Sequence, residues 1–348
     1  MYAGAGGSRL ERFDGPPESL PYHERLRGRA AKHPYEIGWR GWWDIVRRII
    51  ARIGVDNFGL ITAGVTFYIF LALIPAAIAI VTIYGLVIDS ATLASHVAFL
   101  DGILPQQSIS WIAQEIQRIA EAHEKGVTWA LSTSVALSLW AMNNAVVALF
   151  GAMNAAYRET EARSTIGLYL RCFTVTFAAI GFAVIVIGAI VVAPLLSPTQ
   201  AAGATDGGRS TSGPVLFVVV VVCAVAIYRV GPSRRAARWS WILPGALAAA
   251  IGWITAATLL SWYLSNVANY AITYGSLGTI IALMFWLYSS VYIILVGAWL
   301  NAEAEHQTLV DTTIGEIKPL GSRGAVVADR VGRAANERNS PPNTSSGT

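Results

Sequence analysis

The sequence contains six long runs of apolar residues, and no charged side chain lies in the central part of any of them. Roughly 20 helical residues cross a hydrocarbon core of about 30 Å, so runs of this length indicate membrane spans. Only 13% of the residues are charged, whereas a soluble domain is about 25% charged. The pattern predicts an all-α, multi-pass membrane protein and argues against a soluble globular enzyme. The predicted spans are residues 59–88, 127–156, 172–196, 211–230, 241–264 and 275–300.

The basic residues predict the orientation of these spans. Twenty-two of the 25 Lys and Arg residues fall before the first span, in the second-to-third and fourth-to-fifth loops, or after the sixth span. Loops that stay in the cytoplasm carry an excess of Lys and Arg, so both termini are expected on the cytoplasmic side. The first 35 residues hold no apolar stretch typical of a signal peptide, so the first span is expected to be an uncleaved anchor.

The segments outside the spans divide the chain into three parts. Residues 1–35 and 306–348 are polar and are predicted to be mostly disordered cytoplasmic tails on either side of a membrane domain at 36–305. Residues 39–53 carry apolar side chains at helical spacing, which predicts an amphipathic helix. This helix could lie in the membrane interface against anionic headgroups, or pack on the ends of the spans. The loop at 89–126 is predicted to form a helical external cap.

The sequence lacks the common motifs of enzymes and metal sites. It contains no H-x-x-x-H or C-x-x-C pair, no phosphate-binding P-loop and no G-x-S-x-G elbow. We therefore expect no catalytic residue, metal site or cofactor. The basic residues are spread over four segments without forming one stripe, so a nucleic acid partner is not expected either.

Polar residues inside the spans are the best candidates for a functional site. Such residues usually face the interior of a helix bundle. They can form hydrogen bonds between helices, or they can line a path for a solute or a lipid headgroup. The candidates are Thr62, Thr66, Ser132, Thr133, Asn143, Asn144, Thr255 and Thr258.

Three segments resemble the YihY/BrkB family of bacterial inner-membrane proteins, some of which carry the name ribonuclease BN. They are ITAGVTFYIFLALIPAAIAI in the first span, NAAYRETEARS after the second, and YGSLGTIIALMFWLYSSVYIILVGAWLNAEAE in the sixth. The matching positions are Phe67, Tyr68, Pro75, Asn154, Tyr157, Tyr274, Gly275, Ser276, Gly278, Trp286, Asn301 and Glu303. The chain departs from the pattern at Trp299, where relatives usually carry Glu. Any role that this glutamate has in relatives is therefore absent from this chain or is carried by Glu303.

The resemblance implies a six-helix inner-membrane protein with a role in envelope integrity or in lipid or solute export. Together with the polar residues in the spans, it favours a transporter- or flippase-like protein that acts on an envelope lipid or a small solute. The alternative is a scaffold that binds membrane lipids or partner proteins without transport. A nuclease is the least favoured reading, because phosphodiester hydrolysis usually needs metal-binding carboxylates or histidines gathered in a cleft.

Overall fold

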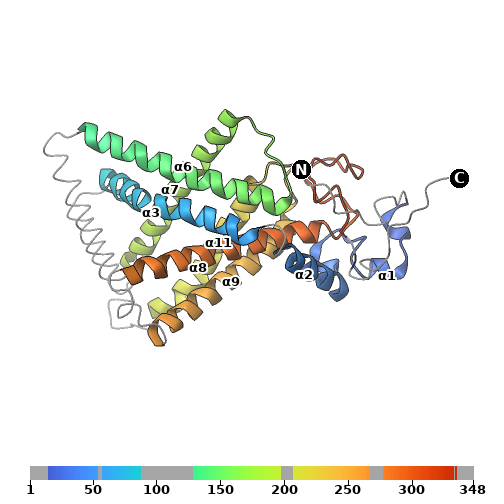
Figure 1. Ribbon diagram of the computed structural model, residues 1–348. Coiled ribbons are helices and arrows are strands. Elements are labelled where there is room, and N and C mark those ends of the chain that lie inside the picture. The colour runs from blue at the N-terminus through green and yellow to red at the C-terminus, as the bar shows by residue number, and fades with distance from the viewer. Residues whose placement is uncertain are drawn as a thin grey trace. The chain divides into compact units, whose positions relative to one another are not determined.

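The computed structural model describes residues 15–53, 57–87, 128–196, 207–266, 277–332 and 334. These residues form helices and loops, with no β-strand among them beyond one isolated bridge between Ala237 and Thr313. The predicted all-α class is confirmed (Figure 1). The helices are α1 (Tyr22–Arg25), α2 (Trp39–Ile53), α3 (Phe58–Val87), α6 (Thr128–Tyr157), α7 (Thr165–Leu196), α8 (Gly207–Val230), α9 (Trp239–Asn266) and α11 (Leu277–Glu305).

Each of the six predicted spans coincides with one long helix, but six crossings are not confirmed. In the described part of the chain, four helical stretches are long and apolar enough to cross a membrane. They are Val135–Tyr157, Thr165–Val186, Trp239–Tyr263 and Ile280–Glu305. A fifth crossing is reached only if α2 and the first part of α3 count as one span, although their axes differ by 73°. In α8 the apolar part is only Pro214–Val230, because its first turns are polar.

The chain divides into two compact units. Unit 1 contains residues 1–63, 150–162 and 216–348, and unit 2 contains residues 64–149 and 163–215. The predicted external cap at 89–126 lies outside the described residues.

In unit 1, α9 and α11 run side by side (Figure 1), and a glycine of each helix lies at their contact. A Cβ atom on Gly245 would collide with the carbonyl oxygen of Gly297, and a Cβ on Gly297 would collide with the hydroxyl of Tyr228. The side-chain amide of Asn301 in α11 also forms hydrogen bonds with the backbone of α9. Its Oδ1 accepts from the N–H of Gly245 at 2.7 Å, and its Nδ2 donates to the carbonyl of Ile242 at 2.8 Å. These are small-residue helix contacts of the kind that membrane helices favour.

Residues 15–35 and 306–332 were predicted to belong to disordered tails, but the structure shows them packed together within unit 1. The guanidinium of Arg29 is fully buried and donates to the carbonyls of Gln307 at 3.1 Å and Gly332 at 2.6 Å. The N–H of Leu309 donates to the carbonyl of Arg29 at 2.8 Å. Leu20, Leu309 and Val331 form a small apolar cluster beside these bonds. Contacts between segments this distant in sequence leave no periodic pattern, so a reading based on composition misses them.

Candidate functional site

The last turn of α11 carries two glutamates, Glu303 and Glu305, whose side chains are fully buried in unit 1. A buried carboxylate is costly unless it is paired and hydrogen-bonded. The C-terminal end of a helix also carries partial negative charge, which disfavours acids there. Their burial therefore requires cations nearby, and the structure supplies arginines from three separate segments.

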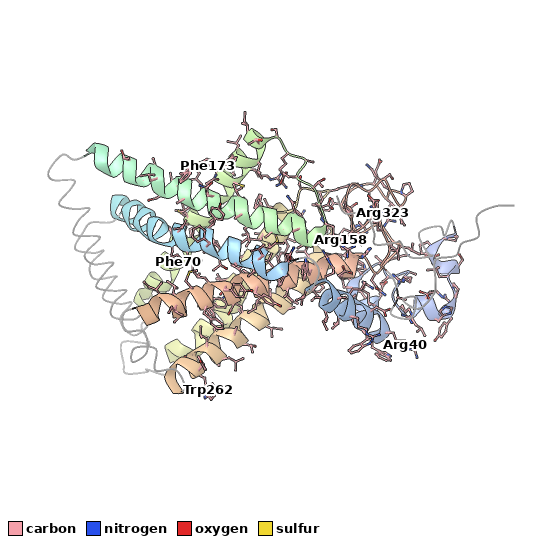
Figure 2. All side chains as sticks on the ribbon, in the orientation of Figure 1. Arg40, Phe70, Arg158, Phe173, Trp262 and Arg323 are labelled. Atoms are coloured by element: carbon pink, nitrogen blue, oxygen red, sulfur yellow. The ribbon has the colours of Figure 1, made fainter. Side chains whose placement is uncertain are left out.

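Three arginines and a histidine surround Glu303. Its Oε2 accepts from Nε of Arg48 at 2.6 Å and lies 3.3 Å from Nδ1 of His306. Its Oε1 accepts from Arg158 at 3.2 Å and from Arg52 at 3.3 Å. Arg48 and Arg52 come from α2, while Arg158 follows α6 directly. The cluster therefore joins α2, the end of α6 and the end of α11. Figure 2 labels Arg158.

Helix carbonyls compensate part of the excess positive charge around Glu303. Arg52 also donates to the carbonyls of Ala156 at 3.4 Å and Ala155 at 3.5 Å, at the end of α6. Arg48 donates to the carbonyl of Glu303 itself at 3.0 Å. Cations are favourable at these helix ends, because the last carbonyls have no partner within the helix.

Arg158 adopts a positive φ of 58°, a conformation that normally favours glycine at the end of a helix. The N–H of Glu159 donates to the carbonyl of Asn154 at 2.8 Å, which closes the turn. An arginine in this conformation costs about 1 kcal/mol or more relative to glycine. The ion pair with Glu303 gives a physical reason for having arginine at this position.

Glu305 has its own partners beside this cluster. The two glutamates with Arg48, Arg52, Arg158, Arg234 and His306 are called the charged layer. Arg234 donates to both carboxylate oxygens of Glu305, at 2.6 and 3.2 Å, and Thr312 donates to Oε2 at 2.9 Å. The guanidinium of Arg234 also lies 4.3 Å from the centre of the Tyr157 ring. Burial alone would lower the pKa of Arg234, but the Glu305 carboxylate outweighs it and raises the pKa. The hydroxyl of Tyr157 lies near the Asn301 amide without forming a well-aligned hydrogen bond.

Two further groups in or beside this layer have shifted pKa values. Burial lowers the pKa of His306 from its ordinary 6.5, although the hydrogen bond to Glu303 acts in the opposite direction. The imidazole is therefore neutral near pH 7 and adds no further cation to the cluster. Burial raises the pKa of Glu159, whose Oε1 accepts from the N–H of Val326 at 2.7 Å.

Every carboxylate oxygen of Glu303 and Glu305 thus has at least one donor within hydrogen-bond distance. Such an arrangement holds the helix ends in place. Within the residues that the structure describes, no three His, Cys, Asp or Glu side chains are grouped so that they could hold a metal ion.

Four positions of the family resemblance meet in or beside this layer, although they come from two separate segments. Asn154 accepts from the N–H of Ser233 at 2.7 Å, while Tyr157, Asn301 and Glu303 make the contacts given above. Trp299, the departure from the pattern, packs 4.3 Å from the Phe58 ring and 4.9 Å from the Arg52 guanidinium.

The other positions of the resemblance lie elsewhere. Gly278 is buried, Trp286 packs 5.0 Å from Trp253, and the exposed rings of Phe67 and Tyr68 lie 5.8 Å apart. Pro75 lies in α3, and its side chain is not among those described. Tyr274, Gly275 and Ser276 fall outside the described residues.

The predicted polar path falls in both units, so it stays a prediction. Thr62, Thr66 and Asn143 are buried, and Asn144 is half-buried. Thr133, Thr255 and Thr258 are exposed. Three threonine hydroxyls bond to carbonyls of their own helices: Thr62 to Phe58 at 2.9 Å, Thr255 to Ile251 at 2.8 Å and Thr258 to Ile254 at 2.9 Å. The side chain of Ser132 is not among those described.

Asn143 differs from the other members of the path. It lies near the middle of the span Val135–Tyr157, and its side chain is fully buried. Within the described part of the chain, neither its Nδ2 nor its Oδ1 has a hydrogen-bond partner. A buried amide left in this state costs about 1–3 kcal/mol, so Asn143 holds unused hydrogen-bonding capacity inside the membrane domain.

Sequence reasoning missed the charged layer as a site. The sequence pattern used four of its arginines only as charges that predict the orientation of the spans: Arg48, Arg52, Arg158 and Arg234. The available signal was the pattern NAEAEH directly after an uncharged apolar run. Acids at the end of a membrane helix need partners, and the basic residues at the ends of the other predicted helices were the available ones.

Comparisons with known proteins agree with this architecture. The family model described as "Virulence factor BrkB" matches residues 49–317. The chain is 33% identical to the "putative ribonuclease-like protein YfkH" of Bacillus subtilis, over 49% of this chain and 64% of that protein. It is 25% identical to a "UPF0761 membrane protein" of Methylibium petroleiphilum, over 76% of this chain and 62% of the relative. A "UPF0761 membrane protein" of Rhodospirillum centenum is also 25% identical, over 88% of this chain and 66% of that protein.

The chain spans less than two thirds of the length of these relatives. No solved structure matches it significantly. The family match covers most of the sequence, and it includes Arg52, Arg158 and Glu303 of the charged layer but begins one residue after Arg48. With its apolar helices and its membrane-protein relatives, the chain is a multi-pass membrane protein and belongs to the BrkB family.

Proposed function

We propose that this protein is a transporter- or flippase-like protein of the bacterial inner membrane, which moves an envelope lipid or a small solute. The observation that carries the proposal is the unpartnered amide of Asn143 in the middle of a membrane span. Intramembrane polar residues are costly, and they commonly mark the path of a substrate.

The chemistry of the amide suits such a role. Asn143 offers two N–H donors and an oxygen with two lone pairs. A hydroxyl, amide or phosphate group of a cargo could bond to both, and would replace part of the hydration that it loses on leaving water. Because the amide has no partner in the described structure, cargo binding would not have to break a protein hydrogen bond first.

We also propose that both termini lie in the cytoplasm, which the distribution of Lys and Arg supports. The charged layer at the end of α11 would then lie at the cytoplasmic ends of the spans. Cysteines at Tyr35 and at Ser108 test this orientation on intact spheroplasts. An impermeant thiol reagent should label position 108 and not position 35, and the reverse pattern would contradict the orientation.

The transport proposal is tested with Asn143→Leu and the neighbouring control Asn144→Leu in proteoliposomes. The probes are a fluorescent phospholipid, whose flipping is followed by chemical quenching of the outer leaflet, and a panel of small solutes. For any probe that the native protein moves, Asn143→Leu should abolish movement and Asn144→Leu should largely preserve it. Melting of Asn143→Leu should be unchanged or raised, since leucine is favourable in a bilayer and no hydrogen bond is lost.

Native transport by Asn143→Leu would overturn the proposal. A lower melting temperature would show instead that Asn143 bonds a neighbouring helix, for which about 0.6 kcal/mol is typical. The second candidate, a scaffold for lipids or proteins, is favoured by the fully paired charges at the helix ends, because such a layer stiffens the structure. It would lead if the native protein moves no probe and both leucine variants complement an envelope-sensitivity phenotype.

A further inference from the structure

Helix α2 presents two different surfaces. Its inner surface packs on the rest of unit 1 through Gly41, Ile45 and Ile49, which are buried. Charged contacts fix the rotation of the helix: Arg48 and Arg52 pair with Glu303, and the buried Asp44 accepts from Arg27 at 2.6 Å. The helix therefore cannot turn about its axis without breaking these ion pairs.

The opposite surface is apolar and uncovered. Trp39, Trp43, Val46 and Ile50 are exposed by 75%, 55%, 38% and 64%. At 3.6 residues per turn these four positions fall within an arc of about 60°, and together they are called the tryptophan stripe below. A continuous exposed apolar surface of this kind marks an interaction site with protein or membrane.

Two arginines flank the stripe along one side. Arg40 and Arg47 are exposed, and their guanidinium groups lie 5.8 and 5.9 Å from the ring centres of Trp39 and Trp43. Neither forms an ion pair with any described residue. Figure 2 shows Arg40 on the side of α2 away from α11. The two charges are thus free for an anionic partner beside the apolar stripe.

The position of α2 in the chain restricts the partner. Five residue steps separate Ile53 from Phe58, the first residue of the apolar helix α3, and such a connection reaches at most about 18 Å. The axes of the two helices differ by 73°. If α3 crosses the bilayer, α2 lies close to the membrane boundary and nearly parallel to it.

We infer that the tryptophan stripe, with Arg40 and Arg47, is a docking surface for anionic phospholipid at the membrane surface. Tryptophan favours the level of the headgroups, and amphipathic helices with basic edges bind anionic bilayers in this orientation. The ion pairs of the inner surface hold the stripe outward in advance, so docking does not require the helix to fold or rotate. This inference is independent of any cargo.

The test uses the full-length protein in nanodiscs, with Cys172 and Cys223 replaced by alanine. A fluorophore is attached to a cysteine at Ile50 in the stripe, or at the exposed Tyr35 as a control site. Quenching by nitroxide-labelled lipid and by aqueous iodide is compared in discs of phosphatidylcholine alone and discs with one third phosphatidylglycerol. Position 50 should be quenched by the lipid probe and protected from iodide, and position 35 should show the reverse.

The charge requirement is tested with Arg40→Gln/Arg47→Gln. The control is Arg25→Gln/Lys32→Gln, which removes the same charge from exposed positions outside α2. In phosphatidylglycerol discs the ratio of docked to undocked label should fall about fivefold for each stripe arginine lost, and less than about twofold in the control. Equal iodide access at positions 50 and 35 would overturn the inference. So would protection without lipid quenching, because a second protein would then cover the stripe.

Discussion

Neutralising Glu303 is the most direct test of the charged layer. The change Glu303→Gln keeps the size of the side chain and leaves Arg48, Arg52 and Arg158 without their carboxylate. Removing one partner of a buried ion pair typically costs 3–5 kcal/mol. The three arginine side chains are 10–29% exposed, so water recovers part of that loss. We therefore expect a smaller destabilisation, of about 2–3 kcal/mol.

The assay is thermal unfolding in detergent, followed by tryptophan fluorescence. A loss of 2–3 kcal/mol corresponds to a melting temperature lower by about 3–4 °C for a protein of this size. The matched control is Glu316→Gln, the same substitution at an exposed position, which should change the melting temperature by less than about 2 °C. Combining Glu303→Gln with Arg48→Gln should recover part of the loss, because one uncompensated cation is removed.

Equal melting temperatures for Glu303→Gln and Glu316→Gln would refute the reasoning. That result would mean that the carbonyls of α6 and α11 balance the arginines without Glu303. It would also remove the physical reason for arginine at position 158, where the backbone conformation favours glycine.

Three further outcomes are expected. The lowered pKa of His306 means that the unfolded chain binds a proton more readily than the folded one. The contribution of the neutral imidazole to stability is therefore present above pH 6.5 and is lost as pH falls through the folded pKa, with a slope of at most about 1.4 kcal/mol per pH unit. His306→Gln should flatten the dependence of the melting temperature on pH. Gly297→Ala should destabilise the protein by about 1–3 kcal/mol through its clash with Tyr228 and Gly245, whereas Gly151→Ala, with nothing within 4 Å of the added Cβ, should not, as parallel melts will show. The purified protein should not cleave RNA, and metal-dependent cleavage that co-elutes with it and disappears in Glu303→Gln would contradict this expectation.

The positions of the long helices could be predicted because an uncharged apolar run leaves little choice of structure in a membrane. Their ends were less predictable. Helix α7 begins at Thr165 rather than at residue 172, because a helix continues through Arg171 beyond its apolar part. The amphipathic helix at 39–53 was predicted at its observed position, but its apolar residues form two surfaces: Ile49 is buried on unit 1 while Trp39 and Ile50 are exposed.

The sequence does not predict which residues of the charged layer pair with one another. Net charge and loop charge are properties of composition, whereas the contact between Arg48 and Glu303 joins residues 255 positions apart. Nothing in the local sequence of either residue specifies the other. The unpartnered state of Asn143 is likewise a property of its surroundings, although its residue type and depth in the span had already marked it as a candidate.

The bonds from Arg29 to Gln307 and Gly332 bear on how the chain is made. Arg29 is synthesised early, while the first of these two carbonyl acceptors is made 278 residues later. At roughly 5–20 residues per second, the ribosome needs about 15–60 s to cover that distance. During this interval the guanidinium lacks these two carbonyl acceptors, so it stays hydrated or relies on earlier residues such as Glu24, whose carboxylate lies 3.5 Å from its Nε. Unit 1 can therefore close only after the last helix has been inserted and the C-terminal segment has left the ribosome.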